Sequence, residues 1–175
     1  FFALLEQIDA DYAAGASTRP CACGGVFHSA PYPRKPRGGP RGWRERVHRR
    51  PSFCCARCRQ RRTPRSVLYL GRRVYLGGVM VLGSALRGTL SGAGLRALVA
   101  ELGVPRATLD QWCRWWNEKF PATRLWQGLR GRCVPPIAGA LPGGLLERIG
   151  APDLATRITR ALQLIAPLST VSEGR

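Results

Sequence analysis

The sequence predicts a mainly α-helical fold that carries one small β-ribbon near its N-terminus. Cysteines gather around residues 21–23 and 54–58, and the segment between these groups is rich in proline and glycine. Apolar residues recur at helical spacing in 95–102, 109–116 and 154–165. Apolar residues make up 45% of the 175 residues, which is enough for a packed core.

Composition shifts divide the chain into four expected segments. They are an N-terminal helix with its linker (1–18), a ribbon with a basic arm (19–66), a helical unit (67–120) and a C-terminal helical extension (121–175). The longest apolar stretch without charge or proline runs from 74 to 86, which is 13 residues, and a membrane helix needs about 20. We therefore expect a cytoplasmic protein without a membrane partner.

Positive charge is concentrated in one part of the chain. The net charge is +18, and residues 19–75 hold 16 Lys or Arg against Glu45 alone, a net of +15 (16 − 1). Such a field attracts a polyanion through steering and counterion release. Coding bias accounts for arginine over lysine but not for the scarcity of acids, so we expect a nucleic-acid partner.

Four cysteines have the spacing of a zinc site. Zinc prefers four soft ligands in a tetrahedron, and thiolates two or three residues apart can bind one ion from a tight turn. Cys21-Ala-Cys23 forms one candidate knuckle and Cys55-Ala-Arg-Cys58 forms the other. We expect a small β zinc ribbon whose structural zinc ion is bound by Cys21, Cys23, Cys55 and Cys58, with Cys54 as an alternate to Cys55.

Other interpretations of the cysteines stay open at this point. His28 and His48 could substitute as ligands, and the first knuckle is Cys-x-Cys rather than the usual Cys-x-x-Cys. The seven cysteines could instead be small buried thiols, or Cys55 and Cys58 could form a redox pair, although no βαβ pattern surrounds them. With zinc bound, folding of residues 19–66 depends on the metal.

The chain before and between the knuckles predicts a helix, a linker and an arm. Residues 1–12 predict a short helix, and small residues over 14–20 predict a linker. The proline and glycine content of 31–43 predicts an extended, mobile arm rather than a helix. Such arms often lie in a minor groove or along phosphates, and a solvated insertion loop is the alternative. The arm residues expected to contact nucleic acid are Arg34, Lys35, Arg37, Arg41 and Arg44.

A helix-turn-helix is predicted in the middle of the chain. After a buried helix over 74–86 and a loop over 87–94, apolar stripes at positions 95, 98, 99 and 102 and at 109, 112, 113 and 116 predict two helices. Gly103 suits the left-handed end of the first helix, and Pro105 suits the start of the second. Val99 departs from the alanine usual at the helix contact, and an ordinary αα-hairpin is the alternative.

The second of these helices carries the candidate base-reading residues. A recognition helix enters the major groove with its first residues near the bases. Arginine recognises guanine bidentately, and glutamine can recognise adenine. We expect Arg106 and Gln111 to contact bases, with Arg114 on the same exposed face, which also includes Asp110.

Three further helices are predicted over 123–129, 145–149 and 154–165, with a loop over 130–144. The last helix has an apolar face at positions 154, 158, 162 and 165. This face covers the core or forms a dimer seam.

The order of these elements resembles that of the N-terminal DNA-binding portion of bacterial insertion-sequence transposases with zinc-ribbon heads. It also resembles that of transposase-associated proteins with the same layout. The resemblance covers about residues 20–120. It rests on CARCRQRRTPRS at 55–66, the apolar helix that follows, and LRALVAELGVPRATLDQWCRWW at 95–116. Their catalytic half does not carry over, because strand transfer needs an acidic cluster and the only acids after residue 120 are Glu147, Asp153 and Glu173.

These patterns together predict a non-enzymatic, zinc-stabilised DNA-binding protein of the nucleoid, associated with a mobile element or acting as a transcriptional regulator. Double-stranded DNA is the expected partner, with a homodimer or a transposase as a further one, and no small-molecule substrate is implied. The alternative is an RNA-binding or ribosome-associated ribbon protein. That alternative needs exposed stacking aromatics, whereas Trp112 and Trp116 fall on a predicted core face. A thiol redox enzyme or a nuclease is a third class, and the sparse carboxylates disfavour the nuclease.

Overall fold

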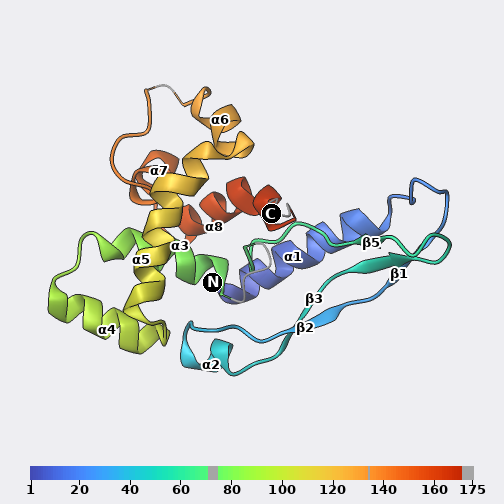
Figure 1. Ribbon diagram of the computed structural model, residues 1–175, viewed down its shortest axis with the longest axis horizontal. Helices are drawn as coiled ribbons and strands as arrows, with labels where there is room; N and C mark the ends of the chain where they lie inside the picture. Colours follow the sequence, from blue (N-terminus) through green and yellow to red (C-terminus); the bar gives the residue numbers. More distant parts are fainter. Residues whose placement is uncertain (71–74, 134, 171–175) are drawn as a thin grey trace.

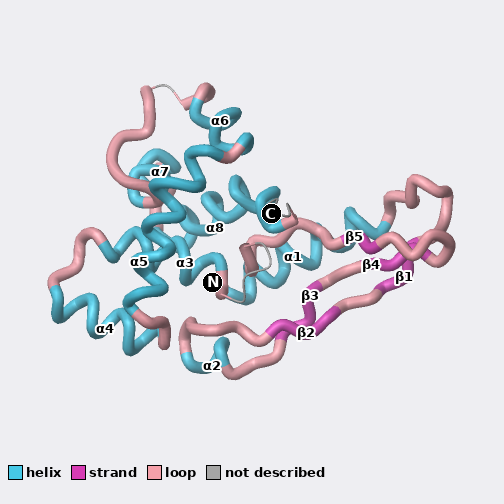
Figure 2. The backbone as a smooth tube through the Cα atoms, viewed as in Figure 1, coloured by secondary structure: helices cyan, strands magenta, loops and turns pink. Residues whose placement is uncertain are grey.

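The computed structural model describes residues 1–70, 75–133 and 135–170. It is mostly helical, with two small antiparallel sheets that form an elongated ribbon on one side of a helical body (Figures 1 and 2). None of its helices in the described part of the chain is long and apolar enough to cross a membrane. The helical elements are α1 (Phe2–Ser17), α2 (Arg41–Arg44), α3 (Gly77–Arg87), α4 (Gly92–Leu102), α5 (Arg106–Arg114), η1 (Trp115–Lys119), η2 (Phe120–Ala122), α6 (Arg124–Arg130), α7 (Gly143–Ile149), α8 (Leu154–Ile165) and η3 (Ala166–Ser169).

The ribbon consists of two short antiparallel sheets in series. One sheet has the strand order β1 (Phe27–Ser29), β4 (Phe53–Cys55), β5 (Arg61–Arg62), and the other pairs β2 (Tyr32–Arg34) with β3 (His48–Arg50). Their register places Phe27 opposite Cys55 and Tyr32 opposite Arg50. The long hairpin runs beside α1, and the arm forms its closed end (Figure 1).

The arm is the extended segment that its composition predicts only in part. Its first residues form β2, which pairs with β3, and its tip includes the single helical turn α2. Trp43 in α2 stacks on His48, with ring centroids 5.0 Å apart, and also packs against Phe2 of α1. Proline and glycine prevent a long helix here, but aromatic packing against α1 and strand pairing fold the segment.

Helix α3 forms the centre of the helical body and packs against α4, α5, α7 and α8. The predicted helix over 74–86 is found, with its start at Gly77; Val74 lies outside the described residues. Gly77 permits a close approach, because a Cβ there would lie 2.9 Å from both Leu162 Cδ2 and the Val67 carbonyl oxygen. The glycines in α3 that weaken the helix signal in the sequence therefore allow tight packing in the structure.

The predicted helices of the C-terminal part are all present. Thr123 caps α6, and Asp153 caps α8, in each case through a side-chain oxygen that accepts the backbone N–H of the third helical residue. In α8, Ile158, Leu162 and Ile165 are buried as predicted, whereas Leu154 is half exposed. Most of this apolar face therefore covers the core of the chain itself.

A buried polar network joins α1 to the ribbon and to the chain that follows it. Asp9 accepts hydrogen bonds from the Ser66 hydroxyl and from the Val67 N–H at 2.7 Å, and lies 3.8 Å from Arg50. Arg50 also donates to the Pro64 carbonyl at 2.9 Å. Burial raises the pKa of Asp9, while the Ser66 and Val67 hydrogen bonds and the Arg50 charge oppose that rise. No local pattern in the sequence indicates this network.

Candidate metal centre and nucleic-acid interface

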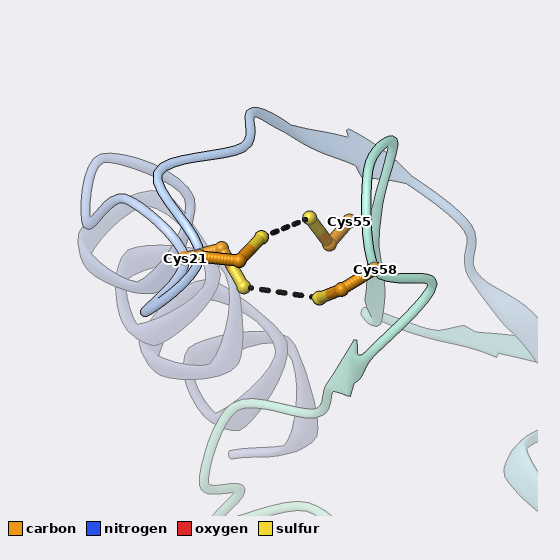
Figure 3. Close-up of side chains that lie close together, drawn as sticks. Cys21, Cys55 and Cys58 are labelled. Carbon is orange, nitrogen blue, oxygen red and sulfur yellow. Dashed lines mark hydrogen bonds between the residues drawn. The ribbon is translucent and has the colours of Figure 1, made fainter.

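Four cysteine sulfurs come together at the open end of the ribbon, next to the C-terminus of α1 (Figure 3). The Sγ atoms of Cys21 and Cys58 are 3.5 Å apart, as are those of Cys23 and Cys55, and all four lie within 4.8 Å of one another. With Zn–S bonds of about 2.3 Å, the sulfurs of a tetrahedral site are about 3.8 Å apart. The cluster therefore fits a zinc ion, and soft thiolates favour zinc over hard cations.

Tight turns and strand pairing bring the two knuckles together. Gly24 has a left-handed φ of 76°, and its N–H donates to the Cys21 carbonyl at 2.8 Å. In the second knuckle the Arg59 N–H donates to the Cys55 carbonyl at 3.1 Å, and Arg59 has a φ of 62°. Because β1 pairs with β4, the first turn faces the second across the end of the sheet.

The electrostatics of the cluster favour a bound cation. Backbone hydrogen bonds, the strongest from the Cys58 N–H, lower the pKa of the Cys55 thiol to about 6. At Cys58 the Gln60 N–H lowers the pKa, but the neighbouring Cys23 and Cys21 sulfurs outweigh it and raise the pKa to about 12. Four adjacent thiolates repel one another unless a cation neutralises them.

The alternate ligands named from the sequence lie outside the cluster. Cys54 projects from the other face of β4, and its Sγ lies 3.5 Å from the Arg59 carbonyl oxygen. His48 is buried against Trp43 and pairs with Glu6 at 3.1 Å, and His28 lies exposed on β1. Alternation along a strand explains the difference, because Cys54 and Cys55 point to opposite faces.

The three residues of α5 that are predicted from the sequence to contact bases, Arg106, Gln111 and Arg114, are all exposed. Asp110 instead binds Arg87 of α3 at 2.8 Å and lies 4.0 Å from Arg106, so it anchors α5 to the body.

Helices α4 and α5 are joined by a turn in which Gly103 adopts the predicted left-handed conformation, with a φ of 59°. The helices leave a groove of about 280 Å³ between them, lined by Leu95, Val99 and Arg106 among others. Val99, which stands where helix-turn-helix proteins usually have alanine, therefore lines an open groove at the place where α4 and α5 were expected to be in close contact.

The arm residues named from the sequence divide into two groups. Lys35, Arg37 and Arg41 are exposed. Arg34 is half-buried, with its guanidinium 5.3 Å from the Tyr32 ring centroid, and Arg44 packs its guanidinium against Gly103. The first group is therefore exposed to solvent, whereas Arg34 and Arg44 contact the protein itself.

Two arginines of the basic stretch have structural roles that the sequence did not indicate. Arg62 donates to the carbonyls of Ala16, Arg19 and Pro20 at 2.6 to 3.1 Å and thereby caps the C-terminus of α1. Arg50 belongs to the Asp9 network described above. Neither role has a local sequence signal, because the α1-side partners (Asp9 for Arg50, and Ala16, Arg19 and Pro20 for Arg62) lie more than 40 residues away along the chain.

Comparisons of the chain with protein-family models, with curated proteins and with solved structures found no match. The chemistry of the cysteine cluster and the exposed arginines is therefore the basis for assigning a function.

Replacing Gly25 with alanine is expected to weaken metal binding at the cluster. The added Cβ would lie 2.7 Å from Cys55 Sγ and 2.9 Å from Arg57 Cβ, so the sulfur must move. We expect a loss of roughly 10–100-fold in zinc affinity, as for other residues that hold a ligand in place. Competition with a chromogenic chelator measures it. Gly15→Ala is the matched control, because nothing lies within 4 Å of that site; equal affinities in the two variants would contradict the prediction.

Proposed function

We propose that this protein is a non-enzymatic DNA-binding protein whose ribbon is stabilised by a structural zinc ion. The observation that carries the proposal is the exposed face of α5, where Arg106, Gln111 and Arg114 follow a left-handed glycine turn. Guanidinium and amide groups on one helix face match the hydrogen-bonding edges of bases in the major groove. A net charge of +18 adds a sequence-independent attraction to phosphates.

In this proposal α4 and α5 act as a helix-turn-helix. Helix α5 enters the major groove with Arg106 nearest the bases, and α4 crosses the backbone. The buried faces of both helices support this, because Leu95, Leu102, Leu109 and Trp112 pack into the core and leave the polar face of α5 outward.

Zinc has a structural role in the proposal. Cys21, Cys23, Cys55 and Cys58 would hold the ion, and its chemistry there is to neutralise four thiolates and crosslink the two knuckles. Four protein ligands leave no open coordination position, which is typical of structural rather than catalytic zinc. This supports a protein without enzymatic activity at this centre.

The resemblance to insertion-sequence transposases supports a role at the ends of a mobile element, and regulation of transcription uses the same DNA contacts. Either role places the protein at the nucleoid, with a second copy or a transposase as a further partner. RNA binding is the competing function, and it needs exposed aromatics for base stacking. Trp112, Trp115, Trp116 and Trp126 are buried, and the fifth tryptophan, the half-buried Trp43, stacks on His48, which favours duplex DNA.

Selection of binding sites from random duplex DNA, with the zinc-loaded protein at near-physiological salt, tests the proposal. We expect an enriched motif, and Arg106→Ala is expected to weaken binding to that motif by about 1–3 kcal/mol and to relax preference at one position. Arg124→Ala, in α6, is the matched control because it removes the same charge from an exposed helix. If no motif is enriched, or if Arg106→Ala and Arg124→Ala bind the motif equally well, α5 does not recognise bases.

A further inference from the structure

The tip of the basic arm is docked on the turn between α4 and α5. The Gly39 N–H donates to the Leu102 carbonyl oxygen at 2.7 Å. Gly38 lies so close to Val104 that a Cβ there would collide with the valine side chain. Figure 1 shows the consequence: α2 and the closed end of the hairpin lie beside the meeting point of α4 and α5.

The docked tip turns an apolar side inward and a charged side outward. Pro36, Gly38 and Gly39 are buried, whereas Arg37 and Arg41 between and beside them are exposed. The side chain of Arg41 is 84% exposed, and its Nε lies 3.8 Å from Glu45. The arm therefore holds its arginines at a fixed place near the first residues of α5.

From this geometry, and resting on the DNA-binding function proposed above, we infer that the arm tip, residues 37–44, is a second DNA-contacting element in fixed register with α5. Its partner is the phosphate backbone next to the base pairs that α5 contacts, on the same duplex. The charge balance supports this partner, because residues 31–47 carry six basic residues against Glu45 alone. Glu45 pairs with Arg41 and offsets one of these charges, whereas Asp110 is paired with Arg87 of α3 and Glu101 is exposed at the end of α4.

A docked arm and a free arm predict different behaviour. A free basic arm adds affinity for any DNA, and it contacts no particular phosphates. A docked arm contacts phosphates at a constant distance from the bases that α5 contacts, since contacts to the backbone set the position of a protein on the duplex. Loss of the docking contact should then reduce binding to the specific site even when every charge is kept.

The first test removes the charge. Arg37→Gln/Arg41→Gln is compared with Arg124→Gln/Arg130→Gln, which removes two exposed arginines from α6, outside the arm and turn. Affinity for the selected duplex is measured across a range of salt, and hydroxyl-radical footprinting maps the protected backbone. We expect the arm variant to lower the slope of log affinity against log salt by about two, or roughly 0.9 per phosphate contact. In the arm variant, a short stretch of DNA backbone beside the motif should lose its protection from hydroxyl radicals. The α6 variant should keep both the salt slope and the protection of the unchanged protein.

The second test breaks the docking and keeps the charge. Gly38→Ala introduces a Cβ against Val104 at a residue whose φ is 90°, so the tip must leave the turn. We expect weaker binding to the selected site and unchanged binding to unrelated duplex. The backbone protection that the arm gives should become weaker and spread over more nucleotides. Circular dichroism and thermal melting check that the helical body remains folded.

The outcomes separate this inference from the proposed function. If Arg106→Ala relaxes the motif but the arm variant matches the α6 control, the arm inference is overturned and the α5 assignment stands. Tighter binding by the arm variant also overturns the inference, because the tip would then shield α5 rather than assist it. If Arg106→Ala has no effect on sequence preference, the proposed function itself is wrong.

Discussion

Removing the metal, or replacing Cys55 with serine, is expected to unfold the open end of the ribbon and leave the helical body folded. The open end has little apolar support beyond Cys21, Phe53 and Cys55, whereas the body buries a large aromatic and aliphatic core. Structural zinc supplies about 10–16 kcal/mol of apparent binding free energy in small sites at neutral pH. That contribution exceeds what the few hydrogen bonds of the two knuckles provide.

Three measurements check this expectation. Metal analysis of purified protein should give one zinc ion per chain, and hydrogen exchange should become fast over residues 21–30 and 53–62 in Cys55→Ser or after chelation. Circular dichroism should retain the helical signal. Cys54→Ser is the matched control, because Cys54 neighbours Cys55 in sequence but its sulfur lies outside the cluster.

The redox interpretation of the cysteines predicts a different result. A redox protein would bind no stoichiometric zinc, and Cys55→Ser would remove thiol activity without unfolding the knuckles. If Cys55→Ser and Cys54→Ser show the same exchange and the same metal content, the zinc assignment fails.

Replacing Asp9 with alanine is expected to destabilise the fold strongly. The substitution leaves the Ser66 hydroxyl and the Val67 N–H without their acceptor and leaves Arg50, 3% exposed, without its carboxylate. Breaking a buried ion pair by removing one partner typically costs about 3–5 kcal/mol. Three segments lose their connection at once, because the network joins α1, β3 and the chain after the ribbon.

Urea denaturation followed by circular dichroism measures the change in the free energy of unfolding. Asp11→Ala is the control, since Asp11 is exposed and accepts a hydrogen bond from the exposed Gln7 one turn earlier in α1. Asp9→Asn should cost less than Asp9→Ala, because its amide oxygen can still accept the Val67 N–H. An Asp9→Ala variant as stable as Asp11→Ala would show that the network contributes nothing to stability.

The arm and the basic stretch show how far a charge pattern can be interpreted without a structure. Composition alone predicts that arginines of residues 19–75 attract a polyanion, and Arg37 and Arg41 are exposed to solvent. Arg44, Arg50 and Arg62 have similar sequence surroundings but bind the protein itself. Their different roles arise from contacts with residues far away in the chain, which no local pattern encodes.

Local signals in the sequence determined the helices of the body and the choice of cysteines. Apolar spacing located α4, α5 and α8, and side-chain caps such as Thr123 and Asp153 act within one turn, so a short stretch of sequence contains the whole cause. Cysteine spacing likewise indicated Cys21, Cys23, Cys55 and Cys58, because a tight turn limits which thiolates can share an ion.

Only the tertiary structure decided how these parts combine. It placed the arm tip on the turn before α5, Asp9 against Arg50, and Arg62 on the end of α1. It also placed Cys54 and its neighbour Cys55 on opposite faces of β4, a strand that pairs with the distant β1 as well as with the nearby β5. These arrangements depend on which surfaces meet when distant segments pack, and packing energy is a property of the assembled fold rather than of any one segment.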